Sequence, residues 1–441
     1  LANSEGHMMW RVCTAALLLL QMAAAHASLT VHIQQTLEKG LDLAVANFSG
    51  PAAGEPLGDI IRNDLRHSPG LRVAKQAVSA WQPGVIEFNE AAPAVTSLTE
   101  AEPSNEPAPA QPQYIVQGFV QQIAPQRYHF SYAVVEPATQ RVVLSGQLKA
   151  GNGRWRAVAH YISDAVYEKL IGVPGMASRQ LAYVQVLPGS RYRLMLADSD
   201  GANARTLLQA TQPLLSPSWS PDGKSIAYVS FEDGQSAIYS QNISTGERTR
   251  LTALTGTSAA PSWSPDGQRL AMSLSAAGNT DIYIYRLSDG ELQRVTDHAA
   301  IDTEPTWAAD GKSLLFTSDR SGRAQIYRLD LSSNDAQRVS FTGRFNARAA
   351  FDPTSDAIVT IHDSGDGRYR LAILESRRAP WLLSSGALAS SPSFAPNGLL
   401  LTYTEQTAGG DRVFFVSRDG QLRWQWPDRL GAVRSAVWSP K

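Results

Sequence analysis

Short apolar runs alternate with turn residues along the second half of the chain, and this arrangement repeats. In "SPSWSPDGKSIAYVS" an apolar run follows a tryptophan and an Asp-Gly turn, and "APSWSPDGQRLAMSLS" and "EPTWAADGKSLLFTS" keep the same order. Weaker copies are "RAAFDPTSDAIVTI" and "SPSFAPNGLLLTYT", and a last fragment is "SAVWSPK". The aromatic residues of the copies lie 44, 44, 44, 43 and 44 residues apart: Trp219, Trp263, Trp307, Phe351, Phe394 and Trp438. A period this regular is typical of a repeat architecture.

Each copy predicts four antiparallel strands. In the third copy a strand ends at Trp307, a turn at Asp310 and Gly311 reverses it, and "SLLFTS" runs back. "DRSG" turns the chain again, and "AQIYRLDL" and "AQRVS" provide the third and fourth strands. These turn residues suit their positions, because aspartate caps the backbone of a turn and glycine accepts a positive φ. Four strands in about 44 residues match one blade of a β-propeller.

The two ends of the repeat region are incomplete in complementary ways. The last copy ends three residues after Trp438 and therefore supplies one strand. The stretch that begins at Arg179, "RQLAYVQVLPGSRYRLMLADSDGANARTLL", supplies three later strands with no turn motif ahead of them. Pairing the two completes a sixth blade and hides edges that an open array would expose. We predict an all-β six-bladed propeller closed by its C-terminal strand, with the recurring aromatic residues packed between blades.

Residues 28–172 lack this period and predict a small α/β domain ahead of the propeller, which takes residues 173–441. Strands are predicted at "LTVHIQ", "LDLAVANF", "YIVQGFV", "YHFSYAVV" and "RVVLSGQL". One helix is predicted between Pro56 and Arg66, and a second begins at Trp155, carries an apolar stripe that ends with Leu170, and stops at Gly172. Residues 91–113, rich in proline and glutamate, predict a mobile surface loop, with a peptide ligand for a partner as the alternative.

The first residues predict processing rather than fold. Residues 1–27 read as a vector-derived remnant followed by a secretory signal peptide, with Arg11 ahead of an apolar run and small residues at Ala25 and Ala27. The apolar run is too short to span a membrane, so we expect a secreted, soluble mature chain starting at Ser28, with an uncleaved anchor as the alternative. The only cysteine is Cys13, and a mature chain without it has neither disulfides nor thiolate metal ligands.

Charge and motifs favour binding over catalysis. The net charge of −1 does not provide the basic surface that nucleic acids require. The chain has no G-x-S-x-G elbow, "GKS" at Gly223 and Gly311 lacks the earlier glycine of a phosphate-binding loop, and no histidines pair at metal-ligand spacing. "DSDG" at Asp198 opens like a calcium loop but lacks its remaining ligands, which favours a hairpin turn. We therefore expect no catalytic residues, no metal and no cofactor.

Binding is predicted at one mouth of the propeller channel. The connections from each outer strand to the next inner strand converge there, and they differ among the copies although the strands do not. A binding partner explains this variation, and so does ordinary variation of solvated loops. The candidate binding residues on these connections are Thr257, Ser258, Ala259, Ala260, Asp302, Thr303, Glu304, Asn346, Arg348, Ser390, Ser391 and Arg434.

The order of these features resembles the TolB family, the periplasmic propeller proteins of the Tol-Pal system. The resemblance rests on the secretory signal, the small α/β domain, the junction "VYEKLIGVPGMASRQLAYV" and the repeats "PxWSPDG…IY…D…G…RLT", and it covers nearly all of residues 28–441. It implies a monomeric, non-enzymatic periplasmic protein that supports outer-membrane integrity and constriction during cell division.

The resemblance also implies specific partners. Pal, the peptidoglycan-associated lipoprotein, is expected at the mouth residues named above, and bacteriocins and other outer-membrane lipoproteins are further expected partners. "TSA" at residues 257–259 stands where the family often has a His-Asn-Gly run. The C-terminal domain of TolA, an inner-membrane protein, is expected to bind the mature N-terminal segment, which suits addition to a sheet edge but also reads as an ordinary first strand. Its residues are Ser28, Leu29, Thr30, Val31, His32, Ile33 and Gln34.

The alternative function is a periplasmic propeller that binds or cleaves a glycan or peptide in its central channel. Pairs of acidic side chains facing into the channel would favour this alternative, since glycoside hydrolysis needs two carboxylates.

Overall fold

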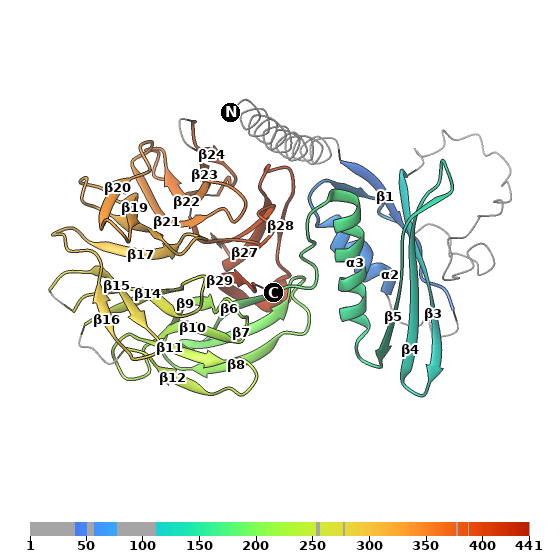
Figure 1. The fold of residues 1–441 in the computed structure, drawn as a ribbon, viewed down its shortest axis with the longest axis horizontal. Coiled ribbons are helices and arrows are strands. Elements are labelled where there is room, and N and C mark those ends of the chain that lie inside the picture. The colour runs from blue at the N-terminus through green and yellow to red at the C-terminus, as the bar shows by residue number, and fades with distance from the viewer. Residues whose placement is uncertain are drawn as a thin grey trace, which may run out of the picture. The chain divides into compact units, whose positions relative to one another are not determined.

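The chain folds into two compact units. The computed structural model describes residues 40–50, 57–76, 112–252, 256–276, 278–375, 378–386 and 388–440. One unit ends at Gly175 and the other begins at Met176, close to the predicted boundary at residue 172 (Figure 1). In the part of the chain just given, none of the helices has both the length and the apolar composition of a membrane-spanning segment. The predicted signal peptide, the predicted strand "LTVHIQ" and most of residues 91–113 lie outside the described residues.

In its described residues, the N-terminal unit consists of a five-stranded mixed sheet and two helices, which confirms the predicted α/β class. The strand order is β2-β1-β3-β4-β5, in which β1 runs parallel to both of its neighbours and the other pairs are antiparallel. The elements are β1 (Leu41–Val45), α2 (Leu57–Arg66), β2 (Leu71–Val73), β3 (Tyr114–Ala124), β4 (Arg127–Glu136), β5 (Arg141–Gly151) and α3 (Trp155–Ile171).

Helix α3 begins and ends as the sequence predicts. Gly172 adopts the left-handed conformation, with φ of 88°, and its N–H donates to the carbonyl of Glu168. Glycine suits this position because it carries no Cβ. The predicted apolar stripe is buried except at its last member, Leu170, which is half-buried, and Ile171 is buried beside it.

A buried polar cluster joins the two helices of this unit. The Asp64 carboxylate on α2 lies 2.8 Å from Nδ1 of His160 on α3 and accepts a hydrogen bond of 2.9 Å from the Ser163 hydroxyl. The Asp64 and His160 side chains are 2% and 4% exposed. Because buried polar groups need partners, this cluster ties α2 to α3 at a defined position.

The C-terminal unit is a propeller of six four-stranded antiparallel sheets, as the period predicted (Figure 1). We number the blades from the sheet that contains both ends of the repeat region. Blade 1 contains β29 (Ala432–Trp438), β6 (Gln180–Leu187), β7 (Arg191–Asp198) and β8 (Arg205–Ala210), and blade 2 contains β9 (Leu214–Trp219), β10 (Ser225–Ser230), β11 (Ala237–Asn242) and β12 (Arg248–Arg250).

The other four blades follow in chain order. Blade 3 contains β13 (Ser258–Trp263), β14 (Arg269–Leu274), β15 (Asp281–Arg286) and β16 (Leu292–Arg294), and blade 4 contains β17 (Asp302–Trp307), β18 (Ser313–Ser318), β19 (Gln325–Asp330) and β20 (Asp335–Arg338). Blade 5 contains β21 (Phe345–Phe351), β22 (Ile358–Asp363), β23 (Arg370–Leu374) and β24 (Trp381–Leu382). Blade 6 contains β25 (Ala389–Phe394), β26 (Leu400–Thr407), β27 (Gly410–Ser417) and β28 (Arg423–Gln425), and the 3-10 helix η1 (Asp428–Leu430) leads to β29.

The predicted turns form for the predicted reasons. In the third copy Gly311 has φ of 66°, and the Asp310 carboxylate accepts the N–H of Lys312 at 2.9 Å. The "DSDG" segment forms the turn between β7 and β8, where the N–H of Gly201 donates to the carbonyl of Asp198 at 2.8 Å. The chain therefore reverses direction wherever aspartate and a glycine with positive φ occur together.

Blade 1 is closed by the C-terminal strand. β29 pairs antiparallel with β6, with Trp438 opposite Leu181, and the red and green arrows lie side by side in Figure 1. Beyond the strand, the N–H of Ser439 donates to the carbonyl of Gln180 at 2.8 Å, and Ser439 Oγ accepts the N–H of Gln180 at 3.0 Å. The pairing predicted from the two incomplete ends of the repeat is therefore present.

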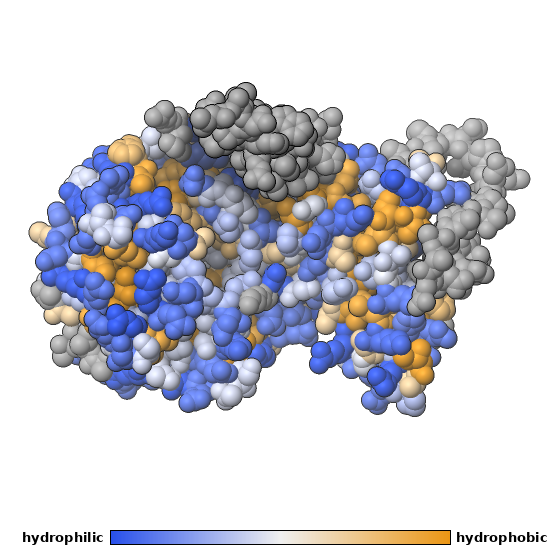
Figure 2. Space-filling view, viewed as in Figure 1, coloured by the Kyte–Doolittle hydropathy of each residue, from blue (hydrophilic) through white to orange (hydrophobic). Residues whose placement is uncertain are grey.

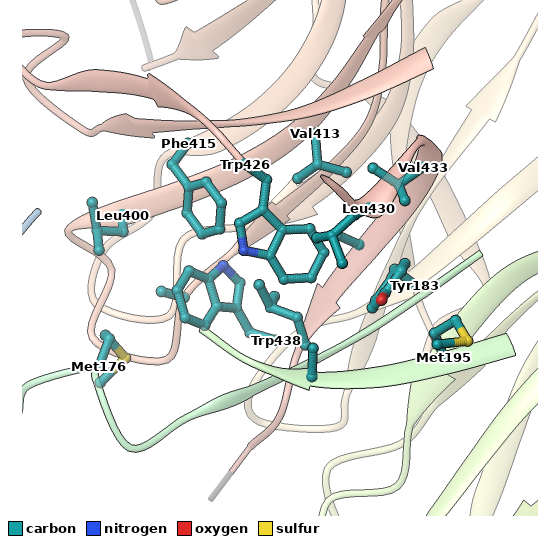
Figure 3. Close-up of a cluster of buried hydrophobic side chains, with 14 residues drawn as sticks. Met176, Tyr183, Met195, Leu400, Val413, Phe415, Trp426, Leu430, Val433 and Trp438 are labelled. Carbon is teal, nitrogen blue, oxygen red and sulfur yellow. The ribbon is translucent and has the colours of Figure 1, made fainter. Parts of the chain in front are cut away.

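An aromatic core seals blade 6 against blade 1. The rings of Phe415, Trp426 and Trp438 gather in it (Figure 3). The Phe415 and Trp438 centroids are 5.7 Å apart with the rings at 82°, an edge-to-face arrangement that adds to the stabilisation from area burial. Elsewhere in the ring, the indole N–H of Trp307 donates across the blade boundary to the carbonyl of Ser262 at 3.0 Å.

Not every recurring aromatic residue is fully buried. Three are buried, and the other three are half-buried but still pack against buried clusters. The buried ones are Trp219, Trp307 and Trp438, and the half-buried ones are Trp263, Phe351 and Phe394. The prediction that they pack between blades is therefore confirmed, with partial exposure at three positions.

Candidate functional site: the propeller mouth

Each blade turns one residue of its inner strand out of regular geometry. A register shift interrupts the pairing of every inner strand with its neighbour. At each shift one non-glycine residue has φ between 49° and 56°, a conformation that is uncommon for such residues. These residues, which we call the channel ring, are Ser216, Ala260, Glu304, Arg348, Ser391 and Ser435. All of them line one cavity of about 440 Å³, to which all six blades contribute.

The channel ring carries one acid and one base, and they are neighbours. Nε of Arg348 lies 2.8 Å from the Glu304 carboxylate, and the backbone N–H of Arg348 donates to the same carboxylate at 3.1 Å. Arg348 also donates to the Ser391 hydroxyl at 3.1 Å, and that hydroxyl lies 3.2 Å from the Ser435 hydroxyl. Hydrogen bonds thus connect four consecutive ring positions across blades 4, 5, 6 and 1.

Hydroxyl groups from the second strands hold the ring in place. Backbone N–H groups of ring residues donate to the neighbouring blade: Glu304 to Ser273 Oγ at 3.0 Å, Arg348 to Thr317 Oγ1 at 3.1 Å and Ser435 to Thr404 Oγ1 at 2.9 Å. The Thr317 hydroxyl also donates to the Glu304 carboxylate at 2.9 Å. Because the register shift moves these N–H groups out of the regular ladder, the hydroxyl groups satisfy donors that would otherwise lack partners.

A second, off-axis pocket opens between blades 4, 5 and 6. Its volume is about 610 Å³. Its walls combine apolar side chains with polar ones. Among the lining residues are Glu304, Ala324, Phe345, Arg348, Tyr369, Leu388 and Asp411. Glu304 and Arg348 also line the axial cavity. The axial cavity and the off-axis pocket, the two hollows of the mouth, therefore share this ion pair as a common wall.

Several predicted mouth residues come together at these two hollows. Ala260 and Ser391 belong to the channel ring, Thr303 and Ser390 line the off-axis pocket, and Glu304 and Arg348 do both. Thr257 is exposed, Ala259 is half-buried, and the guanidinium of half-buried Arg434 lies 5.8 Å from the Tyr192 ring centroid. None of these three lines either hollow.

Three predicted mouth residues have buried side chains instead. Ser258, Asp302 and Asn346 are at most 2% exposed. Asp302 is paired with Arg320 at 2.7 Å, and the Asn346 amide donates to the Gln325 side chain at 2.9 Å. Their side chains therefore support the mouth from beneath, because all three residues occupy the first or second position of an inner strand and do not lie on the exposed connections. The predicted segment from Ser28 to Gln34 lies outside the described residues.

The sequence reasoning missed the wall residues from second and third strands. It followed only the connections, whereas Thr317, Tyr369 and Asp411 reach the pocket from strands or turns of blades 4, 5 and 6. One signal was present, since Ser273, Thr317 and Thr404 occupy corresponding places opposite the inner strand in blades 3, 4 and 6.

Apolar side chains are exposed on three consecutive connections at the mouth. Ile301 precedes blade 4, Phe341 precedes blade 5 and Leu388 precedes blade 6, and they are 51%, 73% and 45% exposed. In Figure 2, which views the molecule from one side, hydrophobic side chains (orange) form separate patches in a largely hydrophilic surface. Exposed apolar side chains on neighbouring connections at one mouth are candidates for contact with a partner.

A buried histidine lies beneath the same connections. His362 Nδ1 lies 2.9 Å from the Asn346 amide oxygen, and Nε2 lies 3.0 Å from the Ser364 hydroxyl. Burial lowers the pKa of His362 below its ordinary value of 6.5, the nearby Arg370 lowers it further, and Asp363 and Asp366 oppose this effect.

This depressed pKa predicts acid sensitivity. The unfolded chain takes up a proton near pH 6.5 whereas the folded chain resists it, so the stability present above that pH is lost as the pH falls toward the folded pKa. We expect the free energy of unfolding of the propeller to fall as the pH drops below about 6.5. Urea titrations check this: His362→Gln should flatten the dependence, and His298→Gln, at an exposed histidine, should not. If the free energy of unfolding fell equally with pH in the wild type and in both variants, His362 would not be the group responsible.

The described residues that line the axial cavity include no pair of acidic side chains of the kind that would favour glycan cleavage. Among the residues that the structure places around the axial cavity, Glu304 is the one carboxylate, and it is bound to Arg348. Glycoside hydrolysis requires two carboxylates on opposite sides of the bond that is cleaved.

Comparison with known proteins identifies the family. The family model described as TolB beta propeller domain matches residues 167–441. Tol-Pal system protein TolB of Xylella fastidiosa (strain M12) is 50% identical over 334 residues, which cover 74% of this chain and 76% of that protein. The protein of the same name from Xanthomonas oryzae pv. oryzae (strain PXO99A) is 50% identical over 333 residues, with the same shares covered. The crystal structure of TolB from Acinetobacter baumannii matches with a TM-score of 0.78 at 33% identity, over 91% of this chain and 97% of that one. The chain therefore belongs to the TolB family.

Proposed function

We propose that this protein is a non-catalytic periplasmic scaffold of the Tol-Pal system. It binds the lipoprotein Pal at the propeller mouth and the C-terminal domain of TolA through its mature N-terminal segment. In this way it supports outer-membrane integrity and constriction during cell division. Bacteriocins use the same mouth, and other outer-membrane lipoproteins are further partners. The curated relatives are named as Tol-Pal system proteins, and this supports the assignment to that system.

The observation that carries the Pal assignment is the composition of the mouth. An ion pair between Glu304 and Arg348 lies at its centre, the off-axis pocket opens beside it, and apolar side chains are exposed on the connections into blades 4, 5 and 6. Protein interfaces combine an apolar core with a few well-placed polar groups in this manner. The single paired carboxylate in the axial cavity suits recognition better than hydrolysis.

A double substitution at the mouth tests Pal binding. Thr303→Arg with Glu304→Arg removes the acceptor of Arg348 and adds two cations, so we expect at least about a 100-fold loss of affinity for the purified periplasmic domain of Pal. The control is Ser332→Arg with Ser333→Arg, on an exposed turn at the opposite end of the same blade. Calorimetry measures both affinities, and circular dichroism checks folding. Unchanged affinity in the Thr303 and Glu304 variant would refute the mouth assignment.

A truncation tests TolA binding separately. Deleting residues 28–36 should abolish binding of the TolA C-terminal domain while Pal affinity and the melting temperature of the propeller stay unchanged. The expected mechanism is addition of an extended segment to a sheet edge, which depends on that segment alone. Retained TolA binding would show that the interaction uses another surface.

A further inference from the structure

The off-axis pocket presents apolar wall surface to solvent. Phe345 and Tyr369 pack edge to face, with centroids 5.1 Å apart and rings at 87°, and both rings remain partly exposed. Leu388 completes this wall from the connection into blade 6. Burying such surface is worth about 25 cal/mol per Å², so the wall favours an apolar group over water.

The charges at the rim are unequal. Glu304 and Arg348 neutralise each other, whereas half-buried Asp411 forms no ion pair with any side chain in the described part of the chain. The nearest base in sequence, Arg412, is directed to the Asp428 carboxylate at 3.5 Å. A carboxylate left without a cation beside an apolar wall favours an occupant that brings a cation.

The pocket makes the mouth asymmetric. It is built by blades 4, 5 and 6, and the three exposed apolar residues Ile301, Phe341 and Leu388 lie on the connections that lead into the same three blades. The pocket also shares the Glu304 and Arg348 wall with the axial cavity. The apolar docking surface therefore extends outward from the axis over one half of the mouth.

We propose that the off-axis pocket receives an apolar side chain of the Pal segment that docks at the mouth, and that a basic side chain next to it on Pal reaches Asp411. This inference rests on the proposed function. It adds that blades 4, 5 and 6 provide most of the affinity for Pal, and that the pocket selects an apolar side chain with a basic one beside it. The apolar group packs against Phe345, Tyr369 and Leu388, and the basic group supplies the missing partner of Asp411. Docking over blades 1, 2 and 3 contributes little.

A matched pair of leucine substitutions tests the apolar contact. Leu388→Asp places a carboxylate in the pocket wall at a side chain that is 45% exposed, and we expect Pal to bind at least tenfold more weakly. Leu382→Asp is the control, because Leu382 is 41% exposed but lies on the outer strand β24 of blade 5, outside the residues that line the pocket. It should bind Pal as the wild type does. Melting temperatures of both variants establish that they are folded.

Two further variants test filling and charge. Ala324→Trp fills the pocket from a half-buried position on its rim and should also weaken Pal binding at least tenfold. Asp411→Lys should weaken it several-fold and reduce the dependence of the affinity on salt, because an attractive charge pair is replaced by repulsion. If Leu388→Asp is unstable, weaker Pal binding by Ala324→Trp with an unchanged melting temperature still supports the inference.

The outcomes separate this inference from the proposed function. If the wild type binds Pal, the Thr303 and Glu304 variant does not, and Leu388→Asp and Ala324→Trp bind normally, the pocket assignment is overturned and the function stands. If the wild type does not bind Pal, the proposed function fails and this inference fails with it. If Leu388→Asp instead changes the oligomeric state measured by light scattering, the pocket is an interface between copies of this chain, and the inference is wrong.

Discussion

Deleting residues 435–441 should destabilise the propeller more than any other change of comparable size. The deletion removes Trp438 from the aromatic core that seals blade 6 against blade 1, and it exposes the edge of β6. It also removes the Val437 carbonyl that accepts the Trp219 indole N–H at 3.1 Å. Loss of one buried tryptophan costs about 3–5 kcal/mol by itself, which corresponds to a fall in melting temperature of roughly 6–20 °C.

A single substitution isolates the tryptophan from the strand. Trp438→Ala should reproduce most of the loss, whereas Trp381→Ala should shift the melting temperature very little, because Trp381 is 52% exposed on an outer strand of the same propeller. Differential scanning calorimetry measures both. A melting temperature unchanged by the deletion would mean that the closure contributes nothing to the stability of the ring.

Asp64→Ala should strongly lower the stability of the N-terminal unit. It removes an acceptor shared by His160 and Ser163 inside a buried cluster, and the expected cost is about 3 kcal/mol. Because the cluster joins α2 to α3, the loss should appear as faster hydrogen exchange in those two helices. Exchange in the propeller strands should stay as it is in the wild type.

The same helix provides the control. Asp59 also lies on α2, but its side chain is 67% exposed, and its buried partner Arg62 also donates to the Val45 carbonyl and the Asn47 side chain. Asp59→Ala should change the stability by less than about 1 kcal/mol, because the carboxylate that is lost is exposed to solvent and Arg62 keeps two other acceptors. If the two variants exchanged at the same rate, burial of the Asp64 cluster would not be what holds the helices together.

Predictions from the sequence held best where the determining signals are local. Turns made by Asp-Gly pairs, the Gly172 helix end and the alternation within each strand depend on residues a few positions apart, so the pattern was enough to place them. The regular period then gave the number of blades, and the missing strands at its two ends gave the closure. The same periodicity placed Thr303 and Glu304 ahead of Pro305, and both residues line the off-axis pocket.

The side-chain arrangement at the mouth could not be predicted from this local pattern. Asp302 and Asn346 belong to connections that the pattern marked as exposed, yet both side chains are buried. The register shift within each inner strand decides which neighbouring residue turns toward the axis. At Glu304 the displaced N–H is held by a hydrogen bond to Ser273 of the adjacent blade.

By itself, then, the sequence determined the repeat, the turns, the number of blades and the way in which the ring is closed, because each of these depends on spacing along the chain. Only the tertiary structure decided which residues meet. Glu304 and Arg348 are separated by a whole blade in sequence, and Asp64 lies far from His160, yet each pair is in contact. Curvature of the ring and packing of the helices bring such residues together, and neither is encoded in the local pattern of hydrophobic and polar positions.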